Sequence, residues 1–146
     1  MDRTQLRNAG LAGVYRAPDQ TLREAARDQA AALDFAVVGA DVSKQRSLLH
    51  VLKKLGEDLG FPPWYGVNLD ALHDCLTDPE WPGAGPTRGY LIEILGLEDF
   101  CRKHPADFAA VLEVLRSAAE IRRQDGTPFW LLVDSSTADL PPLPGR

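Results

Sequence analysis

Short segments made almost wholly of apolar residues recur along the chain, separated by longer segments in which apolar positions have helical spacing. Three of the short segments, 35–38, 90–95 and 129–133, have the length and composition that predict buried β-strands. Residues 13–16 (GVYR) are a shorter strand candidate. Because the strands are apolar throughout rather than alternating, they favour a parallel sheet covered by helices.

Helices are predicted between these strands from the positions of caps and stops. Asp19 or Thr21 is expected to cap a helix that runs to about Ala32. Leucines at helical spacing follow Ser43, which we expect to be an N-cap, and Gly60 is well placed to end that helix. The predicted strands 13–16 and 35–38 are therefore each followed by a helix.

The second half of the chain continues this alternation. Asn68 is expected to cap a helix over 69–77, and Pro105 opens a longer helix that extends to about Gln124. Residues 98–103 are expected to form one or two helical turns. We therefore predict an α/β fold with a small, mostly parallel β-sheet of three to four strands packed with helices.

A single domain is expected for a chain of 146 residues, since residues 1–32 are too few to bury a core of their own. Met1 is followed by charged residues and by no apolar run typical of a secretory signal, and no segment is long enough to span a bilayer. We therefore expect a cytoplasmic protein.

The charge of the chain limits the kind of partner it can have. Its formal net charge is −5, whereas nucleic acids and anionic membranes are held mainly by clustered Lys and Arg, so neither is expected as a partner. A basic protein partner fits better. No Lys or Arg lies between Leu55 and Thr87, and the acids within this window are Glu57, Asp58, Asp70, Asp74, Asp78 and Glu80.

The usual cofactor and hydrolase motifs are absent from the sequence, so we predict no cofactor and no catalytic residue. Cys75 and Cys101 lack the spacing of a metal or redox motif and are expected to be free, buried thiols. One alternative is a metal-dependent hydrolase that uses Asp70, His73 and Asp74 on one helical edge. Such a site needs ligands from other segments, and the sequence identifies none. A plain solvated acidic face is a further alternative.

Residues 61–78 combine an aromatic and proline-rich loop with an amphipathic helix. Leu69, Leu72 and Leu76 recur at helical spacing and are expected to anchor the helix to the core. The opposite edge carries acids beside large aromatic residues, a usual composition for an interface hot spot, although the aromatics could instead only cover the core. The side chains expected to face a protein partner are Trp64, Tyr65, Asp70, His73, Asp74 and Thr77, and Asn68 could serve both as cap and as contact.

The motif W-Y-G-x-N-L-D-A-L-H-D-C-L-T at residues 64–77 resembles the signature of the barstar family, intracellular inhibitors of the ribonuclease barnase. The order of the predicted elements agrees with that family over residues 34–134. The preceding strand and helix, within residues 1–33, resemble an extension found in a bacterial subgroup and are expected to be integral to the domain. Residues 135–146 are expected to be a flexible tail.

The resemblance implies an α/β fold and inhibition of a nuclease by a helix and loop that plug its active site. Asp74 matches the acid that takes the place of a substrate phosphate among the catalytic Arg, Lys and His residues. Asp70 matches a second interface acid, and Trp64 matches the contacting loop aromatic. Further contacts are implied for Asn68, Leu69 and Thr77.

The sequence departs from the family pattern around these acids. Because the central acids are retained, the expected partner is a basic barnase-like ribonuclease or a related toxin nuclease, bound one to one as by an antitoxin or immunity protein. Because the rim differs, barnase itself is not assumed to be the target, and a regulatory module without a nuclease target is the remaining alternative. The departures are Trp64 for Tyr, Val67 for an acid, His73 for Trp, Asp78-Pro79 for a Gly-Trp pair and Ser117 for Glu.

Overall fold

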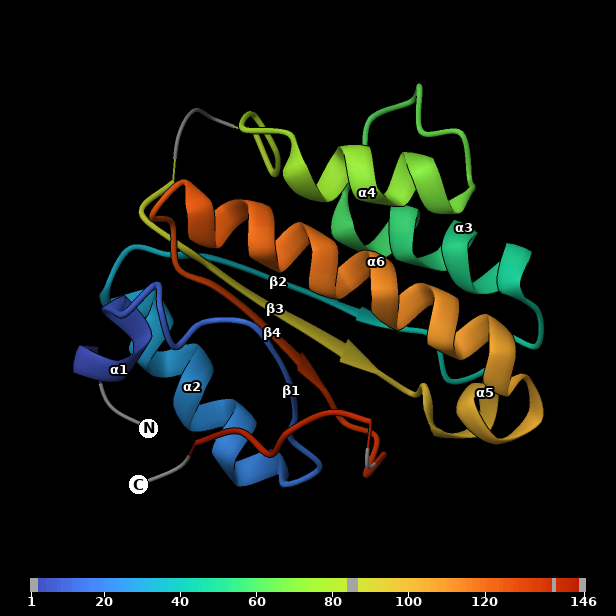
Figure 1. The fold of residues 1–146 in the computed structure, drawn as a ribbon, viewed down its shortest axis with the longest axis horizontal. Coiled ribbons are helices and arrows are strands. Elements are labelled where there is room, and N and C mark those ends of the chain that lie inside the picture. The colour runs from blue at the N-terminus through green and yellow to red at the C-terminus, as the bar shows by residue number, and fades with distance from the viewer. Residues whose placement is uncertain (1–2, 84–86, 138, 145–146) are drawn as a thin grey trace.

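The computed structural model describes residues 3–83, 87–137 and 139–144. In this part of the chain, four strands form one sheet in which every neighbouring pair is parallel. The predicted α/β fold with a small parallel sheet is therefore confirmed. The strands, in the spatial order β1-β4-β3-β2, are β1 (Val14–Arg16), β4 (Phe129–Val133), β3 (Tyr90–Leu95) and β2 (Ala36–Asp41) (Figure 1).

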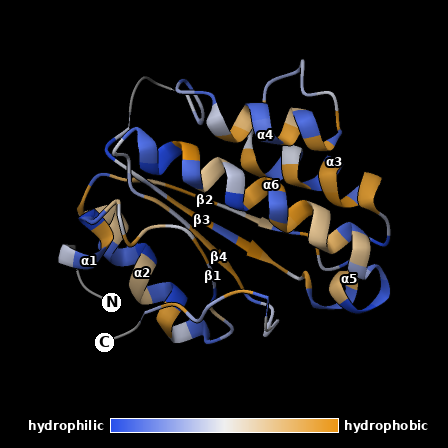
Figure 2. Ribbon diagram, in the orientation of Figure 1, coloured by the Kyte–Doolittle hydropathy of each residue, from blue (hydrophilic) through white to orange (hydrophobic). Residues whose placement is uncertain are grey.

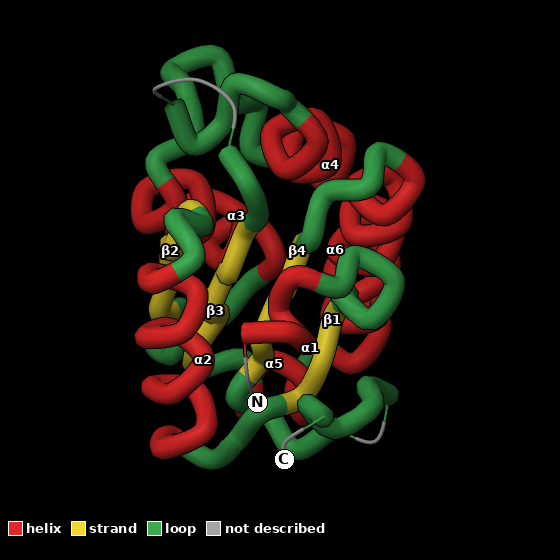
Figure 3. The backbone as a smooth tube through the Cα atoms, turned by 90° about the vertical axis from the view of Figure 1, so that its left-hand side faces the viewer, coloured by secondary structure: helices red, strands yellow, loops and turns green. Residues whose placement is uncertain are grey.

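Helices cover both faces of the sheet, and two apolar cores lie between the layers. Figure 3 shows the strands between helices on either side, and Figure 2 shows that the strands are mainly apolar. Helix α4 packs against α6 and also contacts α3, so it lies in the outer part of its layer. The helices are α1 (Arg3–Arg7), α2 (Gln20–Ala32), α3 (Leu48–Leu59), α4 (Leu69–Thr77), α5 (Glu98–Lys103) and α6 (Pro105–Gln124).

The N-terminal strand and helix share the sheet and the core of the rest of the chain. Strand β1 pairs with β4, and α2 packs over β2 and β3. Ion pairs to the buried Glu93 of β3 join this strand to α2: Glu93 contacts the buried Arg23 at 2.8 Å and the partly exposed Arg27 at 2.7 Å. Residues 1–2 of the expected 1–33 extension lie outside the described residues.

The C-terminal residues return to β1. The backbone N–H of Arg16 donates to the carbonyl of Pro141, and the N–H of Leu143 donates to the carbonyl of Arg16. Leu140 and Leu143 are buried. The expected tail 135–146 is thus attached along part of its length, and its flexibility stays a prediction; residues 138 and 145–146 lie outside the described residues.

Local signals in the sequence set several of the element boundaries. Gly60 ends α3 with φ of 70°, and Pro105 opens α6, as predicted. The expected N-cap at Ser43 is wrong: Ser47 caps α3, because Asp41 accepts a hydrogen bond from the N–H of Ser43 and holds that segment in a turn.

Two other elements differ from the prediction in extent. Strand β2 does not stop before Gly39 but continues to Asp41, since it pairs with β3 along all six of its residues. The short helix α1 was not predicted, and its Leu6 is fully buried. Among the described residues, no helix is both long and apolar enough to cross a membrane.

Candidate protein-binding site

Helix α4 begins at the residue that the sequence predicts as its cap. The side-chain Oδ1 of Asn68 accepts a hydrogen bond from the N–H of Ala71 at 2.8 Å. This bond satisfies one of the donors that the first turn of a helix leaves unpaired. On the inner side of the helix, Leu72, Cys75 and Leu76 are buried. The apolar side is thereby held on the core, and the polar edge is left outside.

Asp70 and Asp74 lie one turn apart on the polar edge of α4, and both side chains are exposed. Within the described part of the chain, neither carboxylate forms a side-chain hydrogen bond or an ion pair. Asp70 is in the first turn, where the helix dipole favours a negative charge. The two acids repel each other by about 0.2 to 0.5 kcal/mol at this spacing, a small cost that an external cation would relieve.

His73 joins α4 to α6. Its Nε2 lies 3.0 Å from the Oγ of Ser117, and the imidazole is half-buried. Ser117 is exposed on α6, so the polar edge of α4 is continued by the neighbouring helix. The two residues that depart from the family pattern on these helices therefore contact each other.

Thr77 closes the last turn of α4 on itself. Its hydroxyl donates to the carbonyl of His73 at 2.8 Å, four residues earlier in the chain. The hydroxyl proton is therefore used inside the helix, and what the side chain can offer a partner is an acceptor oxygen.

The two aromatics of the loop before α4 have different environments. Trp64 is 61% exposed, whereas Tyr65 is half-buried. The Tyr65 hydroxyl donates to the carbonyl of Leu52 on α3 at 2.9 Å, and its ring meets Phe61 edge-on with 5.0 Å between centroids. Burial raises the pKa of Tyr65 to about 12. Tyr65 thus fastens the loop to α3, and Trp64 is free to contact another molecule.

The thiol of Cys75 lies on the buried side of α4, opposite the acidic edge formed by Asp70 and Asp74. Both cysteines are free, as predicted. The prediction of burial is confirmed for Cys75, whereas Cys101 is only half-buried. Burial, together with the nearby Asp78 and Asp74 carboxylates, raises the pKa of Cys75 to about 11. A protonated, inaccessible thiol contributes packing to α4 rather than reactivity.

Arg122 supports the carboxyl end of α4 and was missed by sequence reasoning. Its Nη2 donates to the carbonyls of Leu76 at 3.1 Å and Asp78 at 2.9 Å, and its guanidinium lies 4.6 Å from the centroid of the Tyr90 ring. Position 122 continues the buried stripe of α6, three residues after Ala119. An arginine in register with an apolar stripe is the signal that could have identified it.

The structure also bears on the metal alternative. Within residues 3–83, 87–137 and 139–144, no three side chains of His, Cys, Asp or Glu are grouped in a way that could hold a metal ion. Asp70, His73 and Asp74 therefore share an edge of α4 without forming such a group. From the sequence, a metal site here was expected to need ligands from other segments. No other segment supplies them among the described residues.

The described fold is that of a small parallel α/β domain that presents a helix and its preceding loop on the outside of one helical layer. Residues 35–134 match the family described as Barstar (barnase inhibitor). The match covers more than half of the chain, which therefore belongs to the barstar family, a family of inhibitors rather than of enzymes. No curated protein matched the sequence.

Proposed function

We propose that this protein inhibits a basic barnase-like ribonuclease or a related toxin nuclease, and that it binds the nuclease one to one. Helix α4 and the loop 61–67 would cover the active site of the nuclease. The observation that supports this proposal is the pair of exposed carboxylates, Asp70 and Asp74, without internal partners in the described part of the chain. They lie in a stretch of 33 residues, 55–87, without Lys or Arg.

The chemistry of these acids suits the active site of a ribonuclease. Such a site binds phosphate through Arg, Lys and His, and a carboxylate can take the place of the phosphate through charge-assisted, often bidentate hydrogen bonds. A negative surface facing a positive one also accelerates encounter. Since neither Asp70 nor Asp74 forms an ion pair with another described residue, both can bind a partner at low cost.

Each residue of the surface has a distinct role in the proposal. Asp74 is the anchor at the phosphate position, Asp70 is a second acid contact, and Trp64 packs beside the anchor. An interface of standard size would bury about 800 Å² on each partner. Smaller contributions are assigned to Asn68, Leu69, His73 and Thr77, and to Tyr65 chiefly through its hold on the loop.

The remaining parts of the proposal follow from this mode of action. The protein acts as an antitoxin or immunity protein in the cytoplasm. It uses no catalytic residue and no cofactor, and it binds neither a nucleic acid nor a membrane. The family match and the acidic surface support this reading. Neither the metal-dependent hydrolase nor the regulatory module is favoured by a specific observation.

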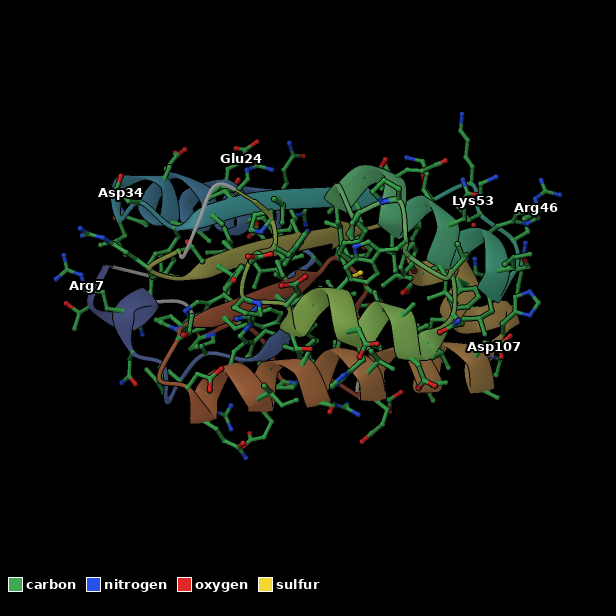
Figure 4. The ribbon with its side chains drawn as sticks, turned by 90° about the horizontal axis from the view of Figure 1, so that it is seen from above. Arg7, Glu24, Asp34, Arg46, Lys53 and Asp107 are labelled. Atoms are coloured by element: carbon green, nitrogen blue, oxygen red, sulfur yellow. The ribbon has the colours of Figure 1, made fainter. Side chains whose placement is uncertain are left out.

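A matched pair of substitutions tests the proposal. Asp74→Asn and Asp34→Asn remove one negative charge each, and Asp34 follows α2 at the end of the molecule away from Arg46 and Lys53 (Figure 4). Asp34 has φ of 61°, a conformation that Asn also tolerates. The probes are barnase and a panel of basic ribonuclease toxins, with Kd and residual nuclease activity measured for each.

The expected result is inhibition of at least one nuclease by the wild-type chain. Asp74→Asn should then raise Kd by about 30-fold or more, which corresponds to about 2 kcal/mol. Asp34→Asn should change Kd by less than about 2-fold, and both variants should keep the unfolding free energy of the wild type. Equal Kd values for the two variants would remove Asp74 as the anchor.

A further inference from the structure

A groove of about 480 Å³ lies beside the acidic edge, between the start of α3 and the residues that lead into α4. Its lining is mainly aliphatic and includes Asp70. It is therefore continuous with the surface that carries the acids. The apolar residues of the groove are Leu48, Leu49, Leu52, Val67 and Leu69.

Leu49 is the most exposed part of this lining. It is 58% exposed, although it lies on a helix whose Leu52 and Leu55 are buried. A single exposed leucine is ordinary on a protein surface. Leu49 is not single, because the half-buried Leu48 and Val67 adjoin it in the same groove. The groove therefore offers a connected apolar surface to a partner.

The backbone at Val67 adds an independent observation. Val67 has φ of 51°, the left-handed region that a β-branched residue rarely adopts. Strain of this kind persists where the surrounding structure holds it, and it clusters at binding sites. A glycine would adopt this conformation without strain, but it would remove the side chain that lines the groove. The valine therefore keeps an apolar wall at the cost of strain.

The charges around the groove indicate what can occupy it. Asp70 lines the groove and also belongs to the polar edge of α4, so a molecule that contacts Asp70 lies beside the groove. Arg46 and Lys53 project from the end of the molecule at which α3 begins (Figure 4). Of these two residues, Lys53 follows Leu49 by four positions on α3 and so lies on the same side of the helix, where it would repel a cation of the partner. An uncharged, apolar side chain fits both the lining and its surroundings.

We propose that this groove receives one large aliphatic or aromatic side chain of the nuclease, located beside the cationic active site that Asp70 and Asp74 bind. This inference rests on the proposed function and extends its interface from α4 to α3. An anchor side chain that fills a pocket contributes strongly to affinity when neighbouring contacts exclude water. The groove thus selects among nucleases whose active sites are equally basic.

Leu49→Ser tests the inference, with Leu11→Ser as its matched control. Leu11 is also an exposed leucine, at 40%, but it lies in the segment between α1 and β1. The probe is the nuclease of the panel whose binding Asp74→Asn weakens. Leu49→Ser should raise Kd by about 10-fold or more, as expected for lost burial of one leucine. Leu11→Ser should leave Kd within about 2-fold of the wild type.

The salt dependence separates the groove from the acids. The loss caused by Leu49→Ser should appear in the dissociation rate and stay the same between about 0.05 and 0.5 M salt, a range over which the screening length falls about threefold. The loss caused by Asp74→Asn should shrink as salt rises. Val67→Gly should change the free energy of unfolding by less than about 1 kcal/mol, because relief of the positive φ offsets the lost packing of a half-buried side chain and the added freedom of the unfolded chain. It should still raise Kd.

Each failure has a different meaning. If Asp74→Asn weakens binding while Leu49→Ser and Val67→Gly leave Kd unchanged, the groove is not occupied and the proposed function stands. If Asp74→Asn leaves Kd unchanged, the proposed binding site is wrong. If the wild-type chain binds no nuclease of the panel, the proposed function is overturned and this inference with it.

Discussion

The ring of Tyr65 lies on Gly56 of helix α3, where an added Cβ atom would come within 2.6 Å of two ring carbons. Since real Cβ atoms do not approach so closely, any larger residue at position 56 has to displace the ring. The Tyr65 hydroxyl is fixed at the same time by its bond to the carbonyl of Leu52. This contact sets the position of the loop that carries Trp64.

Gly56→Ala is expected to destabilise the protein, although alanine is the better helix former by about 1 kcal/mol. Displacement of the Tyr65 ring should outweigh this gain and give a net loss of about 1 to 2 kcal/mol in the free energy of unfolding. Urea unfolding measures it. In a variant that also carries Tyr65→Ala, the ring is gone and Gly56→Ala should become stabilising. An equal loss in both backgrounds would contradict the contact.

Glu93→Gln should destabilise the fold strongly without affecting the binding surface. The buried carboxylate is paired with Arg23, which is also buried, and removing one partner of a buried pair costs about 3 to 5 kcal/mol. Arg27→Ala should cost less, about 1 to 2 kcal/mol, because the Arg27 side chain is 40% exposed.

Urea unfolding of the two variants, together with Kd for the nuclease at 10 °C, tests this expectation. The ion pairs lie on the α2 side of the sheet, away from α4, so Kd of the folded fraction should not change. Equal unfolding free energies for Glu93→Gln and Arg27→Ala would be incompatible with a buried carboxylate whose main partner is Arg23.

Arg122→Met should loosen the carboxyl end of α4. It removes two hydrogen bonds to the carbonyls of Leu76 and Asp78, so a loss of about 2 to 3 kcal/mol in stability is expected. Hydrogen exchange should accelerate in the last turn of α4 more than in α2. Arg122→Lys keeps the charge but cannot reach both carbonyls in the same way, so it should fall between the wild type and Met. Exchange that rises equally in both helices would indicate only global destabilisation.

The free energy of unfolding should fall between about pH 9 and 11 through Cys75. The thiol has a pKa of about 11 in the folded protein, against an ordinary value of 9.0. As the pH rises through this window, the unfolded chain loses the thiol proton first and is stabilised relative to the folded protein. The contribution is therefore complete below pH 9 and lost above pH 11.

Cys75→Ala measures this contribution as a change in slope. The variant should be less stable than the wild type below pH 9, because it leaves a small cavity, but its stability should fall less steeply than that of the wild type between pH 9 and 11. Tyr65→Phe should reduce the slope in the same way between about pH 10 and 12. Parallel curves for the wild type and Cys75→Ala would show that the thiol titrates normally.

Sequence reasoning predicted best where the signal is local. Gly60, Asn68 and Pro105 set helix boundaries through their own backbone conformation or caps, so their roles could be read from the chain. The error at Ser43 is also local: the N–H of Ser43 donates to the side chain of Asp41, two residues earlier, which favours a turn there, and α3 begins only after Ser47. The acids of α4 were also predictable as a shared edge, because residues three and four apart are neighbours on any helix.

The sequence by itself determined the alternation of strands and helices and the acidic edge of α4, because periodicity and capping depend on residues that are close along the chain. Only the tertiary structure decided that Tyr65 holds the loop while Trp64 stays exposed, that His73 meets Ser117, and that Arg122 supports the end of α4. These contacts join residues of different elements, such as His73 and Ser117, which are 44 positions apart. Their geometry depends on how the layers pack, and no local pattern records it.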